Sequence, residues 1–203
     1  MNIIPPEKEA ELALKGILSV SHPADGQFVV MDIGGGSTEF ILASHAGKPL
    51  KWISLDLGVV KLKEMFLKSD PPAESEYSAM CEHIRRTISA VDFIPQPAPV
   101  LIGNAGTVTT LAAIDQQMAD YDPRRINNYE MLYPRIEAMQ RRFLSQPLAE
   151  RRKIAGLEPM RADIIIGGTA VVLEVMDKFA YKSLLACDSG LREGIILEMM
   201  NAE

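Results

Sequence analysis

One segment governs how this chain folds: Phe28-Val29-Val30-Met31-Asp32-Ile33-Gly34-Gly35-Gly36-Ser37-Thr38-Glu39. Its first four residues are apolar and predict a buried strand, which runs into the acidic residue Asp32. Three glycines follow and predict a turn, because glycine adopts positive φ angles and lets a backbone or ligand approach closely. Backbone N–H groups in such a turn can surround a phosphate. The segment therefore predicts a strand, a glycine turn that binds phosphate, and a return strand.

Polar side chains flank this first glycine turn. Asp32 and Glu39 offer carboxylate oxygens, which hard divalent cations prefer, so we expect them to hold Mg²⁺ or another divalent cation. The turn residues Gly34–Gly36 and the hydroxyls of Ser37 and Thr38 form the expected phosphate site. A plain glycine-rich hairpin without a ligand is the alternative that the pattern leaves open.

A second glycine turn, Gly103-Asn104-Ala105-Gly106-Thr107, follows the short apolar strand expected over 100–102. It leads into a helix expected over 108–118, and a helix N-terminus attracts anions through its free N–H groups and its dipole. Ligands of related sheets lie beyond the carboxyl ends of strands, where both turns would meet. We therefore add Gly103, Gly106 and Thr107 to the expected phosphate site.

Composition narrows the class of protein. The chain has 203 residues, of which 47% are hydrophobic and 24% charged, as in ordinary globular proteins. Its net charge of −6 argues against general binding of nucleic acid. Cys81 and Cys187 lack a CxxC motif and a histidine cluster, so we expect a reduced, cytoplasmic protein without a zinc site. No apolar run reaches the roughly 20 residues of a membrane helix, and we expect no membrane partner.

The order of predicted elements indicates the fold class. Strands expected over 27–33, 38–44 and 50–55 are joined by short turns and predict an antiparallel meander. Two strand–helix units follow, with strands over 100–102 and 184–187. Helices are expected over 7–18, 58–68, 74–92, 108–118, 134–144, 148–155, 162–179 and 191–200. Together they predict an α/β fold: a ribonuclease-H-like lobe with a mixed five-stranded sheet, helices on both faces and a helical insert over about 120–160.

Three further features have competing interpretations. Gly167-Gly168 interrupts an apolar helix, which indicates either close packing or a nearby ligand. Asp188 or Ser189 is expected to cap the last helix. By its spacing alone, Glu9 reads as a solvated acidic residue on the first helix.

Taken together, these motifs resemble the exopolyphosphatase / guanosine pentaphosphate phosphohydrolase family of the actin-like ATPase superfamily. The resemblance spans essentially all 203 residues. It is carried by Val29–Glu39, Ser54–Val60, Gly103–Thr107, Arg161–Asp163 with Gly167–Gly168, and Gly190–Gly194.

The resemblance implies a two-lobed enzyme that uses Mg²⁺ to hydrolyse the terminal phosphoanhydride of polyphosphate or guanosine pentaphosphate (pppGpp). In this family the active site lies between two ribonuclease-H-like lobes. A first phosphate hairpin of the Asp-x-Gly-Ser-Asn-Ser type has no counterpart before Asp32. We therefore expect residues 1–203 to form the single carboxyl-terminal lobe, without its amino-terminal partner and with little activity alone. A homodimer is compatible with the resemblance.

The resemblance also gives Glu9 a catalytic role. Ile4-Pro5-Pro6-Glu7-Lys8-Glu9-Ala10 is similar to the family segment Ile-x-x-x-x-Glu-Ala/Gly-Arg, in which the Glu is the general base. Two departures predict altered substrate contacts: Glu11 replaces an Arg, and Asn127-Asn128 replaces His-Gly. Two other functions stay open, namely an ATP-dependent kinase or ATPase lobe and a non-catalytic phosphate- or nucleotide-sensing module.

Overall fold

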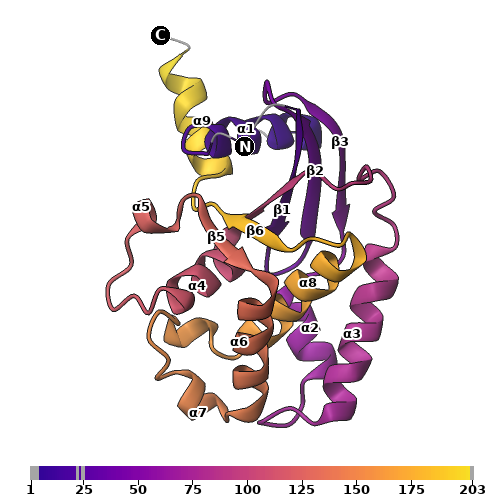
Figure 1. Ribbon diagram of the computed structural model, residues 1–203, viewed down its shortest axis with the longest axis vertical. Coiled ribbons are helices and arrows are strands. Elements are labelled where there is room, and N and C mark those ends of the chain that lie inside the picture. The colour runs from indigo at the N-terminus through magenta and orange to yellow at the C-terminus, as the bar shows by residue number, and fades with distance from the viewer. Residues whose placement is uncertain (1–4, 22, 24–25, 202–203) are drawn as a thin grey trace.

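The computed structural model describes residues 5–21, 23 and 26–201 (Figure 1). Its centre is one six-stranded sheet with the order β3-β2-β1-β4-β6-β5. The strands are β1 Gln27–Ile33, β2 Thr38–Ser44, β3 Pro49–Leu55, β4 Val100–Asn104, β5 Tyr129–Leu132 and β6 Ser183–Ala186. The first three strands form the predicted antiparallel meander, whereas β4 lies parallel to both β1 and β6.

Helices cover both faces of this sheet. They are α1 Pro6–Leu18, α2 Val59–Phe66, α3 Glu74–Ile88, α4 Ala105–Asp115, α5 Pro123–Ile126, α6 Tyr133–Ser145, α7 Leu148–Arg151, α8 Ile165–Lys178 and α9 Leu191–Met200, with a 3₁₀ turn over Pro159–Arg161. Strand β1 is apolar on both sides, as a central strand must be. Val29 and Met31 join the larger core with α2, α3, α4, α6 and α8, while Phe28 and Val30 pack against α1.

Helices α9 and α1 cross closely at two points of their backbones, and they lie together in the upper part of Figure 1. A Cβ at Gly194 would overlap the carbonyl oxygen of Leu12, and one at Gly16 would overlap that of Gly190. Glycine is needed at both positions because the backbones approach so closely. The hydroxyl of Ser189 adds a hydrogen bond of 2.7 Å to the Gly16 carbonyl.

The α/β fold with a mixed sheet is confirmed, but the predicted count of five strands is wrong. The additional strand β5 lies in the segment expected to be a helical insert, and it pairs antiparallel with β6. It has only four residues and a mostly exposed surface, so its sequence carries little strand signal. Pairing with a strand more than fifty residues away stabilises it, which local patterns do not reveal.

Some helix ends also differ from the predicted ones. The helix expected over 108–118 begins already at Ala105, so most of the second glycine turn is helical. The helix expected over 162–179 begins at Ile165, and the one expected over 74–92 ends at Ile88. Within the described ranges, no helix is both long and apolar enough to cross a membrane.

Candidate active site

Three polar residues lie side by side at one edge of the sheet. Asp32 on β1 pairs with Glu39 on β2 and with Asn104 on β4. Directly paired residues point to the same face of a sheet, so these side chains share the face covered by α1. Glu39 is further held by Ser54 on β3, whose hydroxyl donates a hydrogen bond of 2.6 Å to its Oε1 atom. The strand register thus brings together the two predicted metal ligands, Asp32 and Glu39.

Glu9 joins them from the other side of a cavity. This cavity has a volume of about 420 Å³ and lies between α1 and the meander. Its lining comprises Glu9, Ala10, Ala13, Ile17, Val30, Asp32, Ser37, Glu39, Phe40, Ile41, Trp52, Ile53, Ser54 and Leu191, and we call it the carboxylate cavity. Glu9 is exposed on the first turn of α1, whereas Ile4, at the start of its motif, lies outside the described residues. The predicted base therefore lines the same cavity as both predicted metal ligands.

Asp32 is electrostatically unusual. Its pKa is raised from 3.8 to about 6, mainly by burial and also by the negative charges of Glu39 and Glu9. No donor among the described residues hydrogen-bonds to its carboxylate. A desolvated carboxylate beside two others is destabilised when ionised, and a bound cation would relieve that cost.

The first glycine turn is held by α2 on one side and is exposed on the other. The carbonyl oxygens of Gly34 and Gly35 accept hydrogen bonds from the N–H groups of Val59 and Val60, at 3.1 and 3.0 Å. A Cβ at Gly58 would overlap Gly35 and Gly36, so α2 starts directly against the turn. Gly35 and Gly36 are exposed, and their N–H groups make no hydrogen bond within 5–21, 23 and 26–201. These two N–H groups are available to an anion.

The two hydroxyls after the turn have different surroundings. Ser37 lines the carboxylate cavity, as a phosphate ligand would. Thr38 is fully buried, and its hydroxyl donates a hydrogen bond of 2.5 Å to the carbonyl of Leu57. This side chain therefore holds the segment that leads into α2, and a phosphate contact by Thr38 stays a prediction.

The second glycine turn packs closely against neighbouring side chains. A Cβ at Gly103 would lie 2.8 Å from a methyl group of Val108, so close packing alone requires glycine there. Thr107 is buried and faces Gly168 on α8, where a Cβ would lie 2.5 Å from its hydroxyl oxygen. Gly168 thus serves the close packing of α4 and α8, and the phosphate-binding roles of Gly103 and Thr107 stay predictions.

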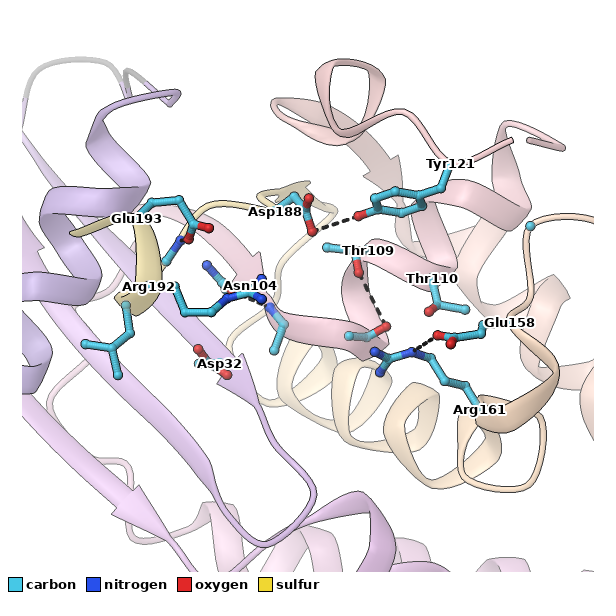
Figure 2. Close-up of a pocket in the computed structure, with 15 residues that line it drawn as sticks. Asp32, Asn104, Thr109, Thr110, Tyr121, Glu158, Arg161, Asp188, Arg192 and Glu193 are labelled. Carbon is cyan, nitrogen blue, oxygen red and sulfur yellow. Dashed lines mark hydrogen bonds and ion pairs between the residues drawn. The ribbon is translucent and has the colours of Figure 1, made fainter. Parts of the chain in front are cut away.

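Of the predicted phosphate ligands in this turn, Gly106 lines a cavity. That cavity, of about 610 Å³, opens beyond the carboxyl ends of β1 and β4 (Figure 2). Its lining comprises Asp32, Asn104, Ala105, Gly106, Thr109, Thr110, Tyr121, Gly156, Glu158, Arg161, Asp188, Gly190, Leu191, Arg192 and Glu193, and we call it the polar cavity. A Cβ at Gly106 would overlap the guanidinium of Arg161, which lies against the start of α4. Asp32 lines both cavities and joins them.

Several residues of the polar cavity were not predicted as site residues. The hydroxyl of Tyr121 donates a hydrogen bond of 2.7 Å to Asp188, and Arg161 contacts Glu158 at 2.8 Å (Figure 2). Asp188 lies just after β6, much as Asp32 lies near the end of β1. Its position at a strand end could therefore have marked Asp188 as a candidate site residue. Tyr121 comes from an irregular segment, where spacing gives no signal, and Arg161 ends the 3₁₀ turn, in a motif that the resemblance marked without giving it a role.

The expected cap of the last helix is wrong. The N–H group of Gly190 donates to Glu193 at 2.8 Å, so Glu193 caps α9 from its first turn. Asp188 instead accepts from Tyr121, while its own N–H group donates to the Asn127 side chain at 2.8 Å. Asn127 therefore positions the loop that carries Asp188.

Asn104 and Ala105 shape the junction between β4 and α4. The Asn104 side chain donates to the Ser189 carbonyl at 2.6 Å and accepts from the Ala105 N–H group. Ala105 has a φ of +67°, a left-handed conformation that residues with a side chain rarely adopt. Such backbone strain concentrates at functional sites. The junction is therefore a second reason to place the site at this sheet edge.

Comparison with known proteins shows which family this chain resembles over its whole length. The Ppx/GppA phosphatase family model matches residues 1–203. Exopolyphosphatase 2 of Mycobacterium tuberculosis is 32% identical over 203 residues, which cover 97% of this chain and 63% of that enzyme. A guanosine-5'-triphosphate,3'-diphosphate pyrophosphatase of Photobacterium profundum is 26% identical, with 99% of this chain and 39% of that protein covered.

A solved structure extends the similarity to the fold. The crystal structure of the Aquifex aeolicus Ppx/GppA family member has a TM-score of 0.90 and 33% sequence identity over 99% of this chain. The chain spans 64% of the length of that structure, in line with its share of the Mycobacterium enzyme. Since the family model covers every residue and the sheet edge carries matching motifs, the chain belongs to the Ppx/GppA phosphatase family.

Proposed function

We propose that this chain forms one wall of an active site that hydrolyses the terminal phosphoanhydride of inorganic polyphosphate or pppGpp. The proposal draws on the names of its relatives, an exopolyphosphatase and a guanosine pentaphosphate pyrophosphatase. It also draws on one observation: the carboxylates of Glu9, Asp32 and Glu39 line a single cavity next to the open glycine turn. In this proposal, a facing lobe supplies the rest of the charge around the substrate, and the chain alone has little activity.

Glu9 is the proposed general base. It is exposed at the cavity and forms no ion pair with any residue that the structure describes, so its carboxylate can accept a proton from a water molecule. The water oxygen then bonds to the terminal phosphorus, and the bond from phosphorus to the bridging oxygen breaks. The shortened substrate leaves with that oxygen, and orthophosphate is the other product.

The glycine turn and Ser37 are the proposed phosphate ligands of this wall. The N–H groups of Gly35 and Gly36 and the Ser37 hydroxyl can donate to the equatorial oxygens of the terminal phosphate. Phosphoryl transfer depends mainly on such positioning and on neutralisation of charge. Because α2 fixes the turn from behind, these donors are held in place before the substrate arrives.

The residues present fit a magnesium ion. Asp32 is desolvated, lacks a hydrogen-bond donor and faces Glu39, so the pair carries uncompensated negative charge. The described residues contain no cluster of three His, Cys, Asp or Glu side chains that would hold a metal alone. Mg²⁺ commonly uses one or two carboxylates and takes its other ligands from water and phosphate. When bound, it would neutralise charge on the phosphate oxygens.

The role of Glu9 is tested by Glu9→Gln in the full-length protein, with release of orthophosphate as the measurement. Loss of a general base lowers kcat by about 10²- to 10⁴-fold, and we expect KM to change little. Glu7→Gln is the matched control, because Glu7 is an exposed acid on the same turn of α1 that does not line the cavity. Hydrolysis that survives Glu9→Gln would contradict the base role. Binding of polyphosphate without any hydrolysis by the wild type would instead favour a phosphate-sensing module.

The role of Asp32 is tested by Asp32→Asn in the same assay. We expect the concentration of Mg²⁺ needed for half-maximal rate to rise at least several-fold, because a neutral amide is a weaker ligand than a carboxylate. Asp120→Asn, at an exposed position that lines neither cavity, is the control. An unchanged Mg²⁺ requirement in Asp32→Asn would remove the metal assignment.

A further inference from the structure

The carboxylate cavity has an apolar end that phosphate chemistry does not use. Across the antiparallel strands β2 and β3, its lining runs from the pair Glu39 and Ser54 to the pair Ile41 and Trp52, two residues away on each strand. Residues two apart on a strand point to the same face, about 7 Å from each other. The apolar end therefore continues directly from the polar end, on the same face of the sheet.

Trp52 is the largest side chain at this end, and it is only partly covered. It lies on β3, the edge strand of the sheet, and 44% of its surface is exposed. The facing wall is α1, where Ala10, Ala13 and Ile17 line the cavity on one side of the helix. The two alanines are small, so the space between α1 and the indole of Trp52 is not filled by side chains.

We infer that Trp52 and the facing side of α1 bind the base of a nucleoside polyphosphate whose terminal phosphate lies at the first glycine turn. This inference rests on the proposed function and specifies its substrate. Inorganic polyphosphate carries charge on every unit and gains nothing from burial against Trp52 and Ile41. A nucleotide combines a flat aromatic group with a polyanionic end, as the cavity combines an aromatic wall with a metal and phosphate end.

The dimensions agree with this ligand. Ile41 pairs with Trp52, and Ser37 lies four residues before Ile41, which corresponds to roughly 13 Å along the strand. An extended nucleoside triphosphate spans such a distance between its base and its terminal phosphate. The volume of about 420 Å³ is in the range of small-molecule sites.

Fluorescence gives a direct test, because Trp52 is the only tryptophan of the chain. The probes are pppGpp and inorganic tripolyphosphate, each with Mg²⁺, which share a terminal triphosphate and differ in the nucleoside. Stacking of guanine on Trp52 should quench its emission on addition of pppGpp, whereas tripolyphosphate should bind without quenching. Calorimetry supplies the dissociation constant of each ligand.

Variants separate stacking from phosphate binding. Trp52→Ala should weaken pppGpp binding on the order of tenfold, since base–aromatic stacking carries that much affinity, and Trp52→Phe should retain most of it. Tripolyphosphate binding should stay unchanged in both. Leu50→Ala is the matched control, because Leu50 lies two residues away on the same strand with 43% exposure but outside the cavity. Ala13→Leu should fill the space and weaken only pppGpp.

The outcomes distinguish this inference from the proposed function. If tripolyphosphate binds and pppGpp neither quenches Trp52 nor depends on it, the base site is wrong and the proposed function stands. Equal weakening of both ligands by Trp52→Ala would also overturn the base site. If the full-length protein neither binds nor hydrolyses either ligand, the proposed function fails and the base site fails with it.

Discussion

The two glycine turns of this chain follow buried strands in similar sequence settings, yet their surroundings differ. At the first turn, Gly35 and Gly36 are exposed, and a Cβ at Gly36 would meet no atom within 4 Å. At the second turn, a Cβ at Gly103 would meet Val108 at 2.8 Å, and one at Gly106 would overlap Arg161. Glycine thus permits ligand approach at the first turn and close packing at the second.

The difference follows from what supports each turn. The first is held from behind by α2, through hydrogen bonds to the carbonyls of Gly34 and Gly35, so its N–H groups can face outward. The second runs directly into α4, whose side chains fold back on the turn that precedes them. A glycine turn after a strand is therefore evidence for a binding site only when another element supports the loop from the opposite side.

The largest effect is expected at the support of the first turn. In Gly58→Ala the new methyl group would overlap the backbone of Gly35 and Gly36, which cannot rotate away as a side chain can. We expect the free energy of unfolding to fall by about 3 kcal/mol. Urea denaturation of the variant and the wild type measures the loss. A loss below about 1 kcal/mol would mean that α2 does not fix this turn.

Substitution of Asp32, the acid at the first turn, should raise the free energy of unfolding instead of lowering it, by an amount that depends on pH. The pKa of Asp32 is raised to about 6 in the folded state, so stability is greatest while it is protonated and falls as pH rises through 6. Without metal, Asp32→Asn should therefore gain about 2 kcal/mol at pH 7 relative to the wild type, and the gain should vanish near pH 4. Urea denaturation in EDTA between pH 4 and 8, with Asp120→Asn as control, tests this. A gain that does not depend on pH would refute the raised pKa.

A smaller loss is expected at the second turn. Gly103→Ala would press a methyl group against Val108, a side chain that can shift by a few tenths of an ångström. We expect a loss of about 1.5 kcal/mol in unfolding free energy, without a specific loss of tripolyphosphate affinity. Thermal or urea denaturation combined with calorimetric binding separates the two quantities. A selective loss of tripolyphosphate binding would mean that Gly103 belongs to the phosphate site.

The smallest change in stability is expected at the tip of the first turn. Gly36→Ala adds a methyl group in open space at an ordinary φ, so the free energy of unfolding should change by less than about 0.5 kcal/mol. If this turn binds phosphate, the same methyl group should weaken tripolyphosphate several-fold by obstructing close approach. An unchanged affinity would make this turn, like the second, a structural one.

Local sequence patterns were sufficient for the main architecture. The apolar run over 28–31, the short turns of the meander and the strand–helix units predicted the α/β fold and most of its elements. Asp32 and Glu39 were predicted as a pair, and their register on β1 and β2 follows from the short turn between them. Strand β5 was missed because a partner distant in sequence stabilises it.

The roles of individual side chains at the turns depended on the tertiary structure. The sequence placed Ser37 and Thr38 together as phosphate ligands, but period-two alternation sends Ser37 to the cavity and Thr38 into the core. In the same way, Thr107 faces Gly168 on α8, while Tyr121 and Arg161 line the polar cavity from segments far apart in the sequence. Such contacts depend on how distant elements pack, which no local pattern encodes.

By itself, the sequence determined the fold class, the first glycine turn and the acids beside it, because strand periodicity, glycine and carboxylate chemistry are local properties. Only the tertiary structure decided that Glu9 lines a cavity with Asp32 and Glu39, that one glycine turn is open and the other packed, and that Trp52 extends the cavity. The physical reason is that exposure, desolvation and shared cavities arise from long-range packing of α1, α2 and α4 on the sheet.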